Sequence, residues 1–64
     1  MPRMSLKAAR INAGYTQKEA AKLLAISNKT LGNWENGISL PNAAAINRIC
    51  ALYNVTYDNL IFRQ

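Results

Sequence analysis

Apolar residues near the start of the chain recur at intervals of three and four, the spacing that places side chains on one face of an α-helix. The pattern predicts a first helix over about residues 6–13, where four residues share a face: Leu6, Ala9, Arg10 and Ala13. Ser5 stands directly before this stretch, where its hydroxyl can accept a hydrogen bond from a free backbone N–H. Gly14 follows it and is typical of a helix end.

A second and a third helix are predicted close together. Thr16 and Glu19 have the spacing of a capping box, in which each side chain bonds a free backbone N–H at the helix start. The apolar residues that follow fill one side of this helix: Ala20, Leu23 and Leu24. Ser27 can cap a third helix that ends before Gly37. Because only a few residues join the two, the segment from about 17 to 36 is predicted to form a helix-turn-helix.

The second half of the chain continues the helical pattern. Pro41 disfavours a helix at the residue before it and marks a loop. A fourth helix is predicted over about residues 42–53, with five inward-facing residues: Ala43, Ile46, Ile49, Cys50 and Tyr53. Thr56 begins a last short helix, and two apolar residues of it would close the core: Leu60 and Ile61. No strand alternation is seen, so the predicted fold class is all-α: a compact five-helix bundle that forms one domain over residues 1–64.

The outer face of the third helix is unusual for a solvated surface. Leu31 and Trp34 have the spacing of the buried face, and four residues stand around the other side: Asn28, Lys29, Gly32 and Asn33. Gly and Asn are poor helix formers, and Gly costs about 1 kcal/mol relative to Ala. A face that gives up helix stability for hydrogen-bonding groups favours a role in contact with a polar partner.

The charge balance indicates what kind of partner this is. Eight Lys and Arg residues stand against three acids, which gives a net charge of +5 in 64 residues and favours polyanions such as DNA or RNA. The single cysteine, Cys50, excludes an internal disulfide, and neither a signal peptide nor a membrane-spanning run is recognisable, so we expect a cytoplasmic protein. With no His, few acids and no metal-ligand cluster, we expect no enzyme activity, metal or cofactor.

Several stretches of the sequence, taken together, resemble a known family. These are "TQKEAAKLLAIS", then "TLGNWENG", then Pro41 and "LYNVTYDNLIF". At this spacing they resemble the Cro/repressor-type helix-turn-helix domains of phage and bacterial regulators, over about residues 6–62. The resemblance implies a lambda-repressor-like DNA-binding fold. Two positions depart from the family pattern, since Ala25 and Asn54 stand where Gly is usual.

The resemblance also implies DNA contacts at positions that can be named. Three residues match the groove-facing positions of the family: Asn28, Lys29 and Asn33. Asn can bond an adenine edge and Lys can reach the acceptors of guanine. Thr30 is a further candidate base contact that could instead bond back to its own helix. The candidate phosphate contacts, which position the domain, are Gln17, Ser27, Asn36 and Lys18. The alternative for these residues is an ordinary solvated face or plain helix capping.

One charged pair is interpreted as structural. In the family, the residues that match Arg10 and Glu35 form an ion pair between the first helix and the end of the third. Loss of one partner would leave an uncompensated charge.

The leading functional hypothesis is a sequence-specific DNA-binding transcriptional regulator, most simply a repressor on a two-fold symmetric operator. Its partners would be double-stranded DNA and a second copy, bound through the C-terminal segment with Leu52, Tyr57 and Phe62. One alternative is an antitoxin that represses its own operon, and another is a protein-interaction module without DNA binding.

Overall fold

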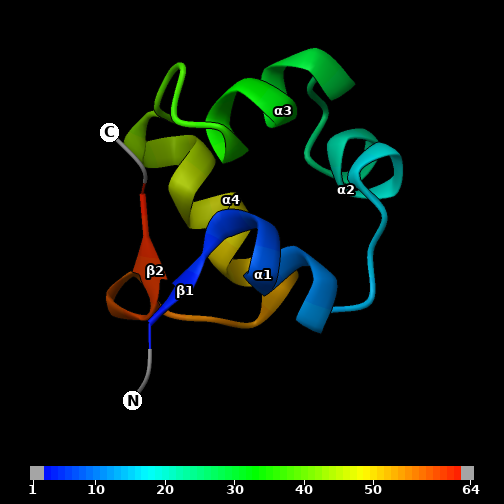
Figure 1. Ribbon diagram of the computed structural model, residues 1–64. Helices are drawn as coiled ribbons and strands as arrows, with labels where there is room; N and C mark the ends of the chain where they lie inside the picture. Colours follow the sequence, from blue (N-terminus) through cyan, green and yellow to red (C-terminus); the bar gives the residue numbers. More distant parts are fainter. Residues whose placement is uncertain (1–2, 63–64) are drawn as a thin grey trace.

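Each of the four α-helices in residues 3–62 is preceded by a polar residue whose side chain accepts a hydrogen bond from a backbone N–H of the first turn. The computed structural model describes residues 3–62 and contains α1 (Leu6–Asn12), α2 (Gln17–Leu23), α3 (Asn28–Glu35) and α4 (Ala43–Tyr53) (Figure 1). Their caps are Ser5, Thr16, Ser27 and Asn42. The predicted capping box between Thr16 and Glu19 is present. The sequence therefore located the starts of α1, α2 and α3 through the side chains that satisfy their free N–H groups, whereas Asn42 was predicted to lie within the fourth helix.

Four residues take a positive φ where the chain leaves a helix or turns. Gly14 (+88°) and Gly37 (+76°) follow α1 and α3, as predicted, and Asn54 (+57°) ends α4 in the left-handed conformation. Ala25, in the turn between α2 and α3, has φ +59°. The turn therefore keeps the geometry that suits Gly although its residue carries a Cβ.

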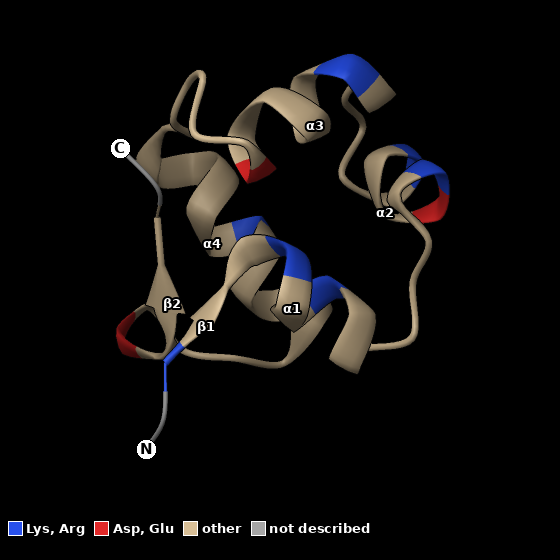
Figure 2. Cartoon of the chain, viewed as in Figure 1, with Lys and Arg blue, Asp and Glu red and all other residues tan. Residues whose placement is uncertain are grey.

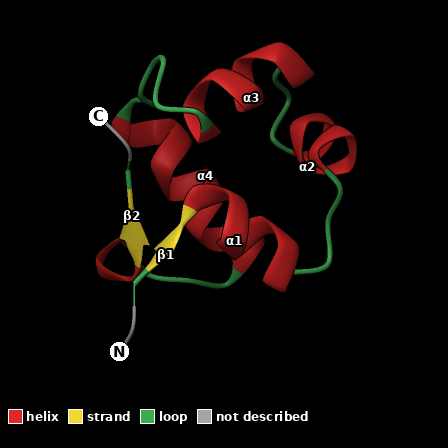
Figure 3. Cartoon of the chain, viewed as in Figure 1, coloured by secondary structure: helices red, strands yellow, loops and turns green. Residues whose placement is uncertain are grey.

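The predicted fifth helix is not formed. Residues Tyr57–Asn59 form one short 3-10 turn, η1, and Leu60–Ile61 then form a strand, β2, parallel to β1 (Met4–Ser5) (Figure 3). The mostly helical class is confirmed, with four α-helices in residues 3–62 rather than five. The strand partner lies at the opposite end of the chain, so no local pattern could show it.

The core lies where the four helices meet. Leu31 and Ile49 are fully buried, and Leu6, Ala20, Tyr53 and Leu60 belong to the same cluster. Three inward predictions are wrong: Ala43, Leu23 and Ile61 are exposed. In α4 the buried alanine is Ala45, because Ala43 is the first residue of the helix and lies outside the packed part of the bundle.

The strain at Ala25 can be measured. We expect Ala25→Gly to raise the free energy of unfolding by about 0.5–1 kcal/mol, because Gly adopts this φ without the steric cost of a Cβ. Chemical denaturation of the two proteins tests this. The control is Ala51→Gly, at an exposed position inside α4, which should lose about 1 kcal/mol. A loss at both positions would mean that the turn holds alanine without strain.

Candidate nucleic-acid interface

The helix-turn-helix is held together by small buried residues between its two helices. Ala20 and Ala21 of α2 are 0% and 2% exposed, and Leu31 of α3 is fully buried. Ile26, in the turn between the two helices, is half-buried and packs against this core. Leu31 thus anchors α3 in the core, while Asn28 and Lys29 at its start are exposed.

Arg10 and Glu35, the predicted ion pair, lie in contact below this surface. The Nε atom of Arg10 donates to Oε2 of Glu35 at 2.8 Å, and the two side chains are 9% and 3% exposed. The Nη1 atom of Arg10 also donates to the backbone carbonyl of Tyr15 at 2.9 Å. The pair therefore fastens α1 to the last residue of α3 and to the loop that precedes α2.

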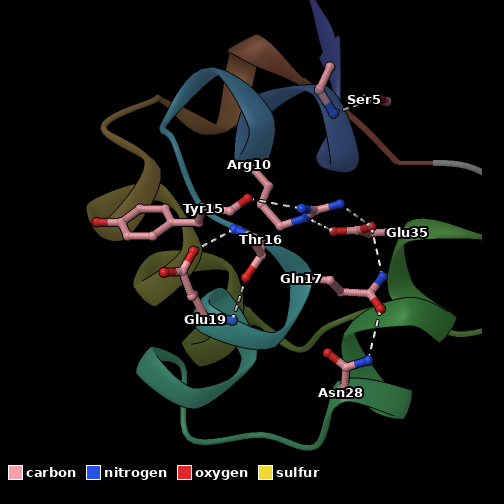
Figure 4. A network of polar contacts seen from close by, with 9 residues as sticks. Ser5, Arg10, Tyr15, Thr16, Gln17, Glu19, Asn28 and Glu35 are labelled. Carbon is pink, nitrogen blue, oxygen red and sulfur yellow. Dashed lines mark hydrogen bonds and ion pairs between the residues drawn. The ribbon is translucent and has the colours of Figure 1, made fainter.

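A chain of amides continues from this pair to the surface (Figure 4). The Nε2 atom of Gln17 donates to Oε1 of Glu35 at 3.1 Å. The Oε1 atom of Gln17 accepts from Nδ2 of Asn28 at 3.0 Å. A Cβ placed on Gly32 would lie 3.6 Å from the Gln17 amide nitrogen, an ordinary contact distance. The start of α3 is thus hydrogen-bonded, through α2, to the buried carboxylate.

The residues proposed to contact bases lie along one side of α3. Asn28 and Lys29 are exposed at its first turn, and Thr30 and Asn33 are half-buried. The Thr30 hydroxyl lies 2.8 Å from the Ser27 hydroxyl. This contact matches the alternative in which Thr30 bonds back to the start of its own helix. The contacts with bases stay predictions.

The residues proposed to contact phosphates lie at the helix ends. Ser27 caps α3, and its Oγ accepts from the Thr30 backbone at 3.0 Å. Gln17 begins α2 and keeps one amide hydrogen beyond the bond to Glu35. Lys18 and Asn36 are exposed. These contacts also stay predictions.

Exposed lysines gather on the same two helices. Lys18 and Lys22 lie on α2 and Lys29 lies at the start of α3, whereas Glu35 is buried at the other end of α3 (Figure 2). Glu19 of α2 is exposed, and its carboxylate accepts from the Thr16 backbone at 2.9 Å. That backbone hydrogen bond lowers the pKa of Glu19. Three exposed lysines thus stand against one exposed carboxylate on α2 and at the start of α3, so this surface is predominantly basic.

The remaining ionisable groups of the core offer no reactive centre. Burial, with the nearby Glu35 carboxylate, raises the pKa of Tyr53 to about 12, so its hydroxyl stays protonated. Burial also raises the pKa of the half-buried Cys50 thiol, which favours the unreactive form. Within residues 3–62 no cluster of His, Cys, Asp and Glu could hold a metal, and no helix is long and apolar enough to cross a membrane.

A second surface is apolar and lies away from these lysines. It comprises Ile38 and Leu40, which are 72% and 55% exposed, with Tyr57 (60%) and the half-buried Phe62. A shallow groove runs through it, lined by Leu40, Pro41, Ile46, Tyr57 and Phe62. The Tyr57 and Phe62 rings stack with centroids 5.9 Å apart. We call this surface the apolar patch. Ile38 and Leu40 were not predicted to form such a surface, although two large apolar residues in one short loop indicate one.

The amino-acid sequence of the chain is similar to those of bacterial regulators. The family model for helix-turn-helix proteins matches residues 6–60. The HTH-type transcriptional regulator ImmR of Bacillus subtilis is 46% identical over 56 residues, which are 88% of this chain and 44% of that protein. The uncharacterized HTH-type transcriptional regulator YazB of the same species is 42% identical over 55 residues, 86% of this chain and 80% of that protein.

A third relative is named for a different role. The antitoxin PezA of Streptococcus pneumoniae is 33% identical over 57 residues, 89% of this chain and 36% of that protein. The chain therefore spans less than half the length of ImmR and of PezA. No solved structure gives a significant match.

The ion pair predicts a large effect on stability. Glu35→Ala should lower the free energy of unfolding by about 2–4 kcal/mol, because it leaves the buried Arg10 guanidinium uncompensated. Thermal or urea melts would measure this, with Asp58→Ala as the control, since that carboxylate is exposed. Equal melts for wild type and Glu35→Ala would show that the pair contributes nothing.

Proposed function

The chain belongs to the Cro/C1-type helix-turn-helix family, and we propose that it is a sequence-specific DNA-binding regulator of transcription, a repressor on a two-fold symmetric operator. The observation that carries the proposal is the exposed polar side of α3, which begins with Asn28 and Lys29 within a basic surface. Such a helix fits the major groove, where base edges present hydrogen-bond donors and acceptors.

Each side chain then has a definite role. Asn28, Lys29 and Asn33 read base edges, and Thr30 lies beside them where its methyl group can meet thymine. Gln17, Ser27, Lys18 and Asn36 hold phosphates and set the register without reading sequence. The exposed lysines of α2 add attraction to any duplex, which is strong at low salt and weak at high salt.

Two copies would bind together. One short recognition helix buries too little surface for tight specific binding, so a second half-site is needed. We assign the contact between copies to the apolar patch, because Ile38, Leu40 and Tyr57 are large, apolar and exposed. Leu52, which we also expected at this contact, is half-buried and packs against the core, as Phe62 does. Arg3 and Asp58 line the adjoining pocket, and opposite charges there suit pairing across a two-fold axis.

A second candidate function is that of an antitoxin. The similarity to PezA favours it, because that relative is named an antitoxin. Such a protein would bind DNA through the same α3 surface and a toxin through another. A protein-interaction module without DNA binding is the remaining alternative, and a salt-dependent gel shift with the purified chain excludes it if the duplex is retarded.

Selection of bound sites from random duplex DNA tests the proposal. We expect one enriched motif with two inverted half-sites about one helical turn apart. Sequences recovered without any enrichment would contradict sequence-specific binding.

Base reading predicts a local effect of mutations on α3. Asn33→Ala and Lys29→Ala should each flatten the preference at one base pair per half-site and cost about 1–3 kcal/mol on the best site, with much less on non-specific DNA. Arg48→Ala, on the exposed side of α4, is the control and should leave every base preference unchanged. Site selection repeated on each variant gives the answer. Unchanged motifs for Asn28→Ala, Lys29→Ala and Asn33→Ala together would remove α3 as the recognition surface.

The apolar patch predicts cooperative binding. Tyr57→Ala should weaken binding to a duplex with two half-sites and leave binding to a single half-site unchanged, because it removes a contact between copies. Ile11→Ala is the matched control, since Ile11 has nearly the same exposure, 57% against 60%, and lies on α1 outside the patch. Titration of both duplexes measures this, and equal losses on the two would place Tyr57 outside the dimer contact.

A further inference from the structure

We propose that Asn36 is a site of spontaneous deamidation, a modification that turns this residue from a DNA contact into a repelling charge. The effect on DNA binding rests on the proposed function, whereas the chemistry at Asn36 does not. The chain has eight asparagines, and Asn36 alone is followed by glycine. Because glycine has no Cβ to shield its nitrogen, an Asn-Gly pair leaves the asparagine side chain open to attack by the next backbone nitrogen.

The reaction needs only the chain and water. The backbone nitrogen of Gly37 attacks Cγ of Asn36, and the new N–C bond closes a succinimide ring. The bond from Cγ to the amide nitrogen breaks, and that nitrogen leaves as ammonia with the hydrogen of the Gly37 N–H. Water then opens the ring at either carbonyl and gives aspartate or isoaspartate. Both products carry a carboxylate where the amide was.

The end of α3 leaves the reacting groups accessible. Asn36 is exposed and caps the helix, and the chain turns at Gly37 with φ +76°. The N–H of Gly37 donates to the Trp34 carbonyl at 3.3 Å, whereas Asn36 and Ile38 each donate at 2.9 Å. The attacking nitrogen is therefore held more weakly than its neighbours on both sides. Because this nitrogen has to swing toward the side chain, away from ψ −1° at Asn36, the rate depends on what holds the helix end.

Asn54 offers a comparison within the same chain. It is also exposed and also ends a helix, α4, but Val55 follows it. The N–H of Val55 donates to the Cys50 carbonyl at 3.0 Å, and its branched side chain crowds the nitrogen. Asn54 should therefore keep its amide under conditions in which Asn36 loses it.

A carboxylate at residue 36 is unfavourable in two ways. It lies at the carboxyl end of α3, where the helix dipole is negative and the last turn has no basic residue to offset it. It also stands where Asn36 is proposed to hold a phosphate, so contact through a neutral amide is replaced by repulsion between like charges. Phosphate contacts carry no sequence information, so deamidation should lower the affinity for all duplexes alike.

Peptide mass spectrometry of the full chain tests the chemistry. After incubation at mildly alkaline pH, aspartate and isoaspartate should accumulate at residue 36 and not at Asn54. In Gly37→Asn the amide of Asn36 should survive, because asparagine tolerates a positive φ, as Asn54 does at +57°, but shields its nitrogen with a Cβ. Acid that forms in Gly37→Asn as fast as in the wild type, or at Asn54 as fast as at Asn36, would overturn the proposal.

Asn36→Asp reproduces one product and measures its effect on binding. It should weaken binding about fivefold per half-site on every duplex, as expected for two like charges about 4 Å apart in water. The slope of log affinity against log salt should become shallower by about 0.9 per half-site, as for one lost phosphate interaction. Asn54→Asp is the matched control, since it adds the same charge at the end of α4 and should leave affinity and slope nearly unchanged.

The remaining outcomes separate this site from the proposed function. Full affinity in a folded Asn36→Asp protein would overturn the effect on binding and leave DNA recognition by α3 intact. Duplex DNA that holds Asn36 should slow the loss of its amide, and an equal rate with and without DNA would overturn the link between DNA and this site. If the wild-type chain binds no DNA, the proposed function fails, whereas acid formed at residue 36 would still establish the modification.

Discussion

The buried contact between Arg10 and Glu35 is the interaction on which the arrangement of the domain depends. One guanidinium bonds the last residue of α3 and the backbone of the loop before α2, so three segments meet at a single charged group. Two charges in a core are costly unless each satisfies the other, and here the Arg10 Nε atom meets Oε2 of Glu35 at 2.8 Å. The pair therefore ties the end of α3 to α1 and to the loop before α2.

Much of the local structure could be predicted because it depends on neighbouring residues. Helix starts were predicted from side chains that bond a nearby backbone N–H, as at Ser5, Thr16 and Ser27. Helix ends were predicted from residues that adopt a positive φ, as at Gly14 and Gly37. The residues of the candidate site were predicted from the same patterns together with the family resemblance. The resemblance also implied the ion pair between Arg10 and Glu35.

What the sequence did not reveal depends on distant contacts. The apolar spacing of Leu60 and Ile61 was interpreted as a helix, but their backbone pairs with Met4 and Ser5 across nearly the whole chain. Leu23 has the spacing of a buried residue but is 60% exposed, which spacing alone cannot tell. The link from Gln17 to Asn28 was also invisible, since both were considered only as separate contacts to DNA.

The pairing of β1 with β2 also bears on how the domain forms. The helices, their caps and the turn at Ala25 are closed by contacts between residues near one another in the sequence, which form quickly. The two strands join residues 4–5 to residues 60–61, so they meet only after a loop of nearly the full chain length has closed. During synthesis, Met4 and Ser5 have no strand partner until Leu60 and Ile61 follow. The helix-turn-helix can thus assemble before the two strands pair, and the pairing of β1 with β2 completes the fold of residues 3–62.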